Sequence, residues 1–248
     1  MSAYSEKEIE CLRKAGRIVA TTLWEMINMI KPGVSTLELD QVAGKVLAQH
    51  GARSAPALLH NFPGHTCISV NHIIAHGRPD KRKLRCGDII NIDVSAEIDG
   101  FFSDVGYTTT IGNANEELVE LCQCSKNALL KGISVCKPGE PIASIGKIIE
   151  KEARENGYTI IKNLCSHGVG KSLHVSPVNI FNYDEPSQEG ILEEGMVIAL
   201  EPYLSTGACR AIELEDGWTM TTHNHSFVAQ FEHTLLITSN QPEILTRL

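Results

Sequence analysis

The amino-acid sequence predicts an α+β fold built from two similar halves. Two segments of 21 residues, 31–51 and 137–157, both begin with Lys-Pro-Gly and both end in Gly. A strand-like run follows in each half: Gly87 leads to Asp93 through DIINI, and Gly195 leads to Glu201 through MVIAL. The halves are offset by 106 residues at the Lys-Pro-Gly segments and by 108 at the acidic runs. We therefore expect two α/β halves related by a pseudo-twofold, with antiparallel strands because the runs alternate with period 2.

Each half is predicted to begin with a pair of helices. Apolar residues recur at helical spacing before each Lys-Pro-Gly, at Ile9, Leu12, Ile18, Leu23, Met26 and Ile30 and again at Leu118, Leu121, Leu129 and Ile133. Pro-Gly ends the leading helix, and the final Gly suits the left-handed position after the second helix. Ser35 and Glu38 have capping-box spacing, and Pro141 suits the first turn of the corresponding helix in the other half.

A β-hairpin is predicted around Asp99-Gly100. If these residues form a two-residue turn, Ile98 pairs with Phe101 and Ser95 pairs with Asp104. Asp93 then lies on the same face as Ser95 and diagonal to Asp104. Diagonal neighbours are about 7–8 Å apart at the backbone, so the two carboxylates can converge on one ligand.

Four carboxylates lie in strand-like apolar runs where an unpaired charge is costly: Asp93, Asp104, Glu201 and Glu232. Four negative charges balance two divalent cations, and neutral His167, in a glycine-rich turn, adds a nitrogen ligand. This oxygen-rich set suits Mn, Fe, Co or Zn better than Cu(I). A dinuclear site of this kind generates hydroxide near neutral pH and polarises a carbonyl, so hydrolysis is the expected reaction.

Each of these residues also has an ordinary explanation when it is taken alone. Asp104 can be a polar residue at a strand end, and Glu201, which precedes Pro202, can mark a strand terminus that faces water. His76, His167 and His174 can be turn histidines.

Other motifs in the chain do not predict a site. GVGKS at 168–172 lacks the first glycine of a phosphate-binding loop, because Cys165 occupies that position. His223 and His225 lie in a polar turn typical of loop histidines. No Gly-x-Ser-x-Gly elbow is present.

Composition narrows the class of protein further. The formal net charge of −8 argues against a dedicated nucleic-acid surface, and the basic run 81–83 with Arg85 is interpreted as a solvated loop face. The first residues lack a signal-peptide layout, and no apolar run approaches the roughly 18 residues that span a bilayer. The 8 cysteines are therefore expected to be reduced thiols, which favours a cytoplasmic protein.

Five strings together closely resemble type I methionine aminopeptidases over almost the whole chain: NFPGHTCISVNHIIAHGRP, GDIINIDVSAEIDGFFSD, CSHGVGKSLHVSP, IALEPY and QFEHT. The resemblance implies the pita-bread (creatinase/aminopeptidase) fold, in which two pseudo-symmetric halves enclose a dinuclear metal site. It also implies one catalytic domain over residues 1–248, with halves at about 1–112 and 113–248.

The resemblance implies a role for each site residue. Asp93 would bind one metal ion, His167 and Glu201 the other, and Asp104 and Glu232 would bridge two divalent ions (Co, Mn, Fe or Zn). A metal-bridging hydroxide would attack the first peptide carbonyl, with Glu201 as the proton shuttle. His76 and His174 would orient the substrate, and His174 would also stabilise the reacting amide.

The implied reaction removes the N-terminal methionine from nascent proteins and peptides, with preference for a small second residue. By position the methionine pocket includes Leu59, Phe62, Cys67, Leu173 and Trp218. Leu59 and Leu173 replace aromatic residues common in the family. Pro56 and Val175 stand where a cysteine and an acid are frequent.

Alternatives stay open at this point. A proline-directed exopeptidase of the same fold usually carries an additional amino-terminal domain. A type II enzyme carries an insertion, whereas only 26 residues separate His174 from Glu201 here. A non-catalytic peptide-binding module would typically lose metal ligands, and a metal-dependent phosphoesterase does not fit the motif contexts. The expected partners are N-termini of nascent chains, with transient ribosome proximity, no membrane and a monomeric state.

Overall fold

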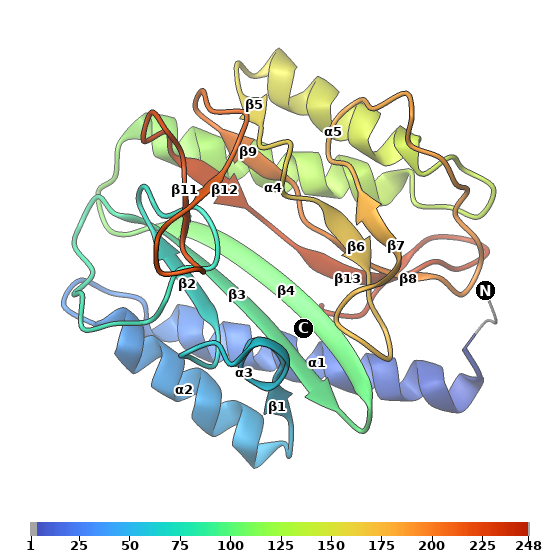
Figure 1. Cartoon of the computed structure of the whole chain (residues 1–248), viewed down its shortest axis with the longest axis horizontal. Helices are drawn as coiled ribbons and strands as arrows, with labels where there is room; N and C mark the ends of the chain where they lie inside the picture. The colour runs from blue at the N-terminus through green and yellow to red at the C-terminus, as the bar shows by residue number, and fades with distance from the viewer. Residues whose placement is uncertain (1–3, 248) are drawn as a thin grey trace.

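The computed structural model describes residues 4–247, and its helices lie outside a set of antiparallel strands. Figure 1 shows α1 and α2 on one side of the strands and α4 and α5 on the other, with the β3–β4 hairpin running between them. The elements of the first half are α1 (Glu6–Met29), α2 (Thr36–Gln49), β1 (Arg53–Ser54), α3 (Ala55–His60), β2 (Cys67–Val70), β3 (Ile89–Ile98) and β4 (Phe101–Thr110).

The second half also begins with two helices and continues with strands. Its elements are α4 (Glu116–Ser134), α5 (Ala143–Glu155), β5 (Thr159–Ile160), β6 (Ser166–Gly168), β7 (Val175–Ile180), β8 (Val197–Leu200), β9 (Tyr203–Ser205), β10 (Ile212–Glu213), β11 (Met220–Thr221), β12 (Val228–Gln230), β13 (His233–Leu236) and β14 (Glu243–Ile244). In the first half β2 and β4 flank β3, and in the second half β6 and β13 flank β8, antiparallel in each case.

Local sequence explains where the helices begin. Ser5 and Ser35 each form a capping box, with Glu8 and Glu38 respectively, so the first orphan N–H groups of α1 and α2 are satisfied. Pro141 departs from the prediction, because α5 begins at Ala143 and Pro141 instead pairs in an isolated bridge with Ile191. Ile142 already has helical dihedral angles, φ −56° and ψ −36°, and the N–H of Ser144 donates to the carbonyl of Pro141 at 3.0 Å, so Pro141 lies just before the first turn of α5.

Equivalent backbone contacts recur in the two halves at the predicted offsets. The N–H of Gly33 donates to the carbonyl of Leu84 at 2.8 Å, and the N–H of Gly139 donates to the carbonyl of Leu192 at 2.8 Å. Both glycines have positive φ, 91° and 88°, which glycine adopts without strain. The sequence repeat is therefore a structural repeat, while a division at 1–112 and 113–248 stays a prediction.

The predicted hairpin register is confirmed. Asp99 and Gly100 both have positive φ, and Ser95 pairs with Asp104 as expected from a two-residue turn. The other two acids differ from the prediction, because they lie at breaks in strands. Glu201 follows the end of β8, and Glu232 lies between β12 and β13.

Two main apolar cores match the two halves. One packs α1 and α2 against β2, β3 and β4, and the other packs α4 and α5 against β8, β12 and β13. Tyr107 contacts both cores, so the strands between the helix layers form one continuous interior. Within residues 4–247, no helix combines the length and apolar character needed to cross a membrane.

Candidate metal centre and substrate cavity

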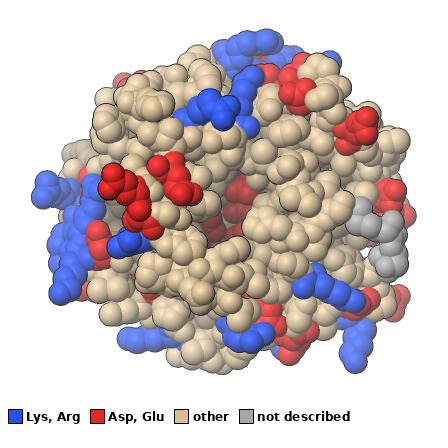
Figure 2. Space-filling view, viewed as in Figure 1, with Lys and Arg blue, Asp and Glu red and all other residues tan. Residues whose placement is uncertain are grey.

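A cavity of about 460 Å³ opens between the two halves. Figure 2 shows the molecule hollowed near its centre, with acidic side chains inside the hollow. The lining includes acids from both halves, three histidines and an apolar set: Asp93, Asp104, Glu201, His76, His167, His174, Phe62, Cys67, Leu173 and Trp218. Glu232 is not part of the lining and lies buried beside it, with 1% of its surface exposed.

The β3–β4 hairpin supplies the first two carboxylates. Asp93 pairs with Gly106, and Asp104 pairs with Ser95, so both acids are fixed by a regular ladder. Both acids line the cavity, where Asp93 is half-buried and Asp104 is 7% exposed. The N–H of Val105 donates to Asp104 Oδ1 at 3.0 Å.

Strands β6 and β8 supply a histidine and a third acid. His167 pairs with Ala199, two residues before Glu201. The N–H of Glu201 donates to Ser166 Oγ at 2.8 Å, which fixes the backbone at the strand break. His167 Nε2 then lies 3.5 Å from Glu201 Oε1. The other ring nitrogen, Nδ1, lies 3.1 Å from the carbonyl of Gly168, an arrangement typical of metal-binding histidines.

Glu232 is tied to the first half by its own backbone. Its N–H donates to the carbonyl of Gly106 at 2.9 Å. Gln230 Nε2 donates to Glu232 Oε2 at 3.0 Å, and Gln230 is itself held by Asn91 Nδ2 at 2.7 Å. Glu232 Oε1 is buried and has no hydrogen-bond partner within residues 4–247. An unsatisfied buried acceptor is costly, so this oxygen is suited to binding a cation.

The ligand atoms of three of these residues converge. One donor atom each from Asp104, His167 and Glu232 lies within 4.8 Å of the others. The three residues come from β4, β6 and the break before β13, so the cluster exists only when the halves are assembled.

Burial and mutual repulsion shift the ionisation of the acids. Burial raises the pKa of Asp93 to about 6. Burial and the charge of Asp93 raise the pKa of Glu201 to about 8, although the Tyr203 hydroxyl, 2.8 Å from Glu201 Oε2, opposes the shift. Burial, followed by the charges of neighbouring acids, raises the pKa of Asp104 and Glu232 well above their ordinary values.

Divalent cations fit this set of donors. They would neutralise the clustered carboxylates and give Glu232 Oε1 a partner. Burial, and then the nearby charge of His174, lower the pKa of His167 to about 4, so the ring is neutral at pH 7 and free to bind metal. The five predicted ligand residues are therefore brought together in one place.

The metal-free protein is expected to lose stability as pH rises from 6.5 to 8.5. Carboxyl groups whose pKa is raised on folding stabilise the protein below their unfolded pKa, and this stability is lost as pH passes the folded value. The pKa of Glu201 is about 8, so its contribution to the free energy of unfolding should fall by about 2 kcal/mol between pH 6.5 and 8.5. The lowered pKa of His167, about 4, acts in the opposite sense, because the unfolded imidazole still releases its proton just above pH 6.5, and it offsets a small part of this loss.

Calorimetry of the chelated protein should show a melting temperature lower by about 4–8 °C at pH 8.5 than at pH 6.5. The protein saturated with Mn²⁺ is the control, because its carboxylates are ionised throughout and its melting temperature should change little. Equal pH dependence of the two samples would contradict this account.

Gly106→Ala is expected to weaken metal binding by about 10- to 100-fold, the effect typical of losing a residue that orients a ligand. A Cβ on Gly106 would overlap with the amide of Gln230, which donates to Glu232. Titration calorimetry with Co²⁺ or Mn²⁺ measures the change. Gly207→Ala is the control, since its Cβ would meet nothing closer than 3.6 Å. Equal affinities in the two variants would exclude a role for Gln230.

The apolar side of the cavity is close to the acids. Cys67 pairs with Asp93 across β2 and β3. Phe62 and Trp218 pack edge to face at 5.3 Å between ring centroids, and Leu173 is 6% exposed. Leu59 differs from the other predicted pocket residues, because it is 42% exposed and is not part of the lining. Pro56 lines the cavity and Val175, the first residue of β7, does not.

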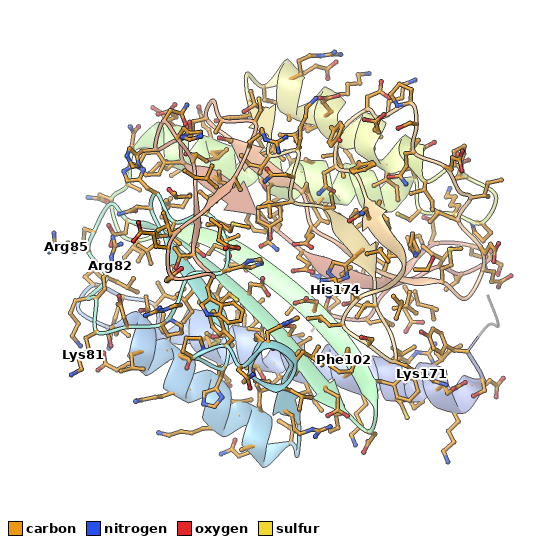
Figure 3. All side chains as sticks on the ribbon, viewed as in Figure 1. Lys81, Arg82, Arg85, Phe102, Lys171 and His174 are labelled. Carbon is orange, nitrogen blue, oxygen red and sulfur yellow. The ribbon has the colours of Figure 1, made fainter. Side chains whose placement is uncertain are left out.

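The two predicted substrate histidines lie beside the cluster. His174 packs on His167 with 4.3 Å between ring centroids, and Figure 3 shows His174 in the central region between the two halves. His76 has a left-handed φ of 51°. Burial lowers the pKa of both rings, so each is neutral at pH 7.

Sequence reasoning does not identify Tyr203, Gln230 or Glu213 as parts of the site. The spacing in the sequence could have indicated two of them. Tyr203 and Gln230 each lie two residues from a predicted acid, and an extended chain places residues two apart on the same face. Glu213 has no such signal.

The histidines and basic residues that the sequence analysis interpreted as loop residues lie away from the cavity. His223 and His225 are exposed and are not part of its lining. Figure 3 shows Lys81, Arg82 and Arg85 at the outer edge of the molecule, with their side chains directed away from the cavity.

The chain belongs to metallopeptidase family M24, which it matches over residues 10–239. The fold is accordingly the pita-bread fold, and divalent metal binding is a property of the family. Proline-specific relatives share this fold: the prolidase from Pyrococcus furiosus superposes with a TM-score of 0.78 at 24% identity, but the match covers 99% of this chain and only 65% of the prolidase.

Within the family the chain is similar to methionine aminopeptidases over its full length. It is 47% identical to methionine aminopeptidase 2 of Bacillus subtilis (strain 168), with 100% of both chains covered. It is 41% identical to the methionine aminopeptidase of Staphylococcus epidermidis, covering 100% of this chain and 99% of that one. The solved methionine aminopeptidase from Thermotoga maritima superposes over 100% of both chains with a TM-score of 0.96 and 34% identity. The resemblance seen in the sequence is thereby confirmed.

Proposed function

We propose that this chain removes the N-terminal methionine from peptides and nascent proteins by metal-dependent hydrolysis. The observation that carries the proposal is the position of the acid and histidine cluster at the wall of an apolar cavity, in a chain similar end to end to methionine aminopeptidases. Neither a proline-directed exopeptidase nor a binding module has comparable support.

Two divalent ions, Co, Mn, Fe or Zn, would be held by Asp93, Asp104, His167, Glu201 and Glu232. When bound, such ions lower the pKa of water towards neutrality and polarise a carbonyl. Asp104 and Glu232 come from opposite halves and lie in the convergent cluster, which supports their role as bridging ligands. Glu201 would move the proton, because it lines the cavity 3.5 Å from His167 Nε2 and its second oxygen accepts a hydrogen bond from Tyr203.

The remaining residues bind and orient the substrate. Phe62, Cys67, Leu173 and Trp218 would hold the methionine side chain, since a thioether suits an apolar pocket. Neutral His174 would donate a hydrogen bond to the carbonyl oxygen as negative charge develops there. His76, which also lines the cavity, would orient the peptide.

The cellular setting belongs to the same proposal. An enzyme that acts on new N-termini would work in the cytoplasm near the ribosome, as a monomer whose site needs no second copy. Both halves of the site come from one chain, which supports this view.

Peptide hydrolysis before and after metal addition tests the function. The chelated protein should be inactive on Met-Ala-Ser, and Mn²⁺, Fe²⁺ or Co²⁺ should restore release of methionine. Met-Lys-Ser should react little because its second residue, lysine, is large. Ala-Pro peptides should react little because they lack an N-terminal methionine. Silence on Met-Ala-Ser with every metal would refute the enzyme, and preferential cleavage of Ala-Pro would favour the proline-directed alternative.

A further inference from the structure

The β10–β11 hairpin brings a carboxylate, Glu213, to the substrate cavity. Glu213 pairs with Met220, and Met220 forms an isolated bridge with Ala75, the neighbour of His76. Glu213, Met220 and Trp218 all line the cavity. The hairpin therefore forms a wall that joins the apolar pocket to His76.

The turn of this hairpin is held rigidly, and its own acid is occupied. Asp216 accepts hydrogen bonds from the N–H groups of Trp218 and Thr219 at 3.0 and 2.9 Å, and Arg78 lies 3.5 Å from it. Glu213 differs, because its exposed carboxylate forms no ion pair or hydrogen bond with residues 4–247. Its charge is thus available to a ligand in the cavity.

The charge of Glu213 acts inside the cavity. Burial lowers the pKa of His76, and the negative charge of Glu213 opposes that shift. Figure 2 shows acidic side chains gathered beside the hollow as well as within it. Bound metal ions would neutralise the inner acids, but they would leave this outer charge in place.

We propose that Glu213 determines specificity for the third residue of the substrate, favouring a basic side chain and disfavouring an acidic one. The inference rests on the proposed aminopeptidase function. The first side chain would occupy the apolar pocket and the small second residue would lie beside the histidines. Each further residue of an extended peptide advances about 3.3–3.6 Å, so the third side chain reaches the cavity mouth where Glu213 is exposed.

The expected preference is modest and depends on salt. At about 6 Å in water, exchanging an attractive unit charge for a repulsive one changes a rate constant about tenfold. Screening is strong for exposed charges, since the Debye length falls from about 10 Å at 0.1 M salt to about 3 Å at 1 M.

Three peptides that differ only at the third residue test the inference: Met-Ala-Lys-Ser, Met-Ala-Gln-Ser and Met-Ala-Glu-Ser. With Mn²⁺-loaded enzyme at low salt, kcat/KM should fall in that order, with about a tenfold spread that narrows at 1 M salt. Glu213→Gln should reduce the Lys-to-Glu ratio to about two or less, and Glu213→Asp should retain most of it. A purely structural role would change all three rates together.

Glu215→Gln is the matched control, because Glu215 is exposed on the same hairpin but does not line the cavity. It should keep the wild-type ratio. Equal rates for the three peptides with wild-type enzyme, or an unchanged ratio in Glu213→Gln, would overturn the inference while leaving the aminopeptidase function intact. Inactivity on all three peptides would instead overturn the proposed function and this inference with it.

Discussion

Asp104→Asn is expected to lower kcat/KM on Met-Ala-Ser by at least about a thousandfold. Bound metal supplies several kcal/mol of transition-state stabilisation, and about 4 kcal/mol corresponds to a thousandfold in rate. The substitution keeps the size of the side chain and removes the charge of a residue whose donor atom lies within 4.8 Å of those of His167 and Glu232. Atomic emission should show fewer than two metal equivalents per chain.

The same substitution at Asp88 is the matched control. Asp88 precedes β3, is 7% exposed as Asp104 is, and contacts Asn71 at 2.8 Å without lining the cavity. Asp88→Asn should therefore keep its metal and its activity. Wild-type turnover in Asp104→Asn, or equal losses in both variants, would refute the proposed role of Asp104 as a metal ligand.

The β3–β4 hairpin could be predicted from sequence because its determinants are local. The Asp-Gly turn fixes the register, and alternation then fixes which side chains share a face. The relation between Asp93 and Asp104 depends on these facts alone. The ten paired positions from Ile89 to Ile98 agree with that register.

The second half of the site could not be predicted at the same level, because its determinants are distant in sequence. Glu232 is positioned by a backbone bond to Gly106, and the strand around Asp104 is held by Thr234 Oγ1, which donates to the carbonyl of Asp104 at 2.8 Å. Those contacts cross the boundary between the halves. Periodicity indicates that a residue is buried, but it does not show that the strand breaks there.

The methionine pocket shows the limit of inference by position. Phe62 and Leu59 are three residues apart, yet Phe62 is 5% exposed and Leu59 is 42% exposed. Helix α3 ends between them, where Asn61 adopts a left-handed φ of 55°, and the chain changes direction at that residue. Leu59, which replaces an aromatic residue common in the family, therefore lies at a surface position, and this difference leaves the lining of the cavity unchanged.

His174→Ala is expected to lower kcat by about 10²–10³-fold while leaving metal content unchanged, the cost typical of removing one donor to a developing oxyanion. Burial, and then the nearby charge of His60, lower the pKa of His174, so the ring is neutral at pH 7 and donates through an N–H without first gaining a proton. The loss in kcat should therefore be constant between pH 7 and 8.5.

Two further variants separate donation from packing, since His174 also lies against His167 at 4.3 Å between ring centroids. His174→Phe keeps an aromatic ring and should be as impaired as His174→Ala, whereas His174→Gln keeps an N–H donor and should recover part of the loss. Full activity in His174→Phe would show that His174 acts only by packing its ring against His167 and donates no hydrogen bond to the substrate. A fall in metal content in all three variants would show that His174 acts by supporting His167, so the metal measurement decides between the two roles.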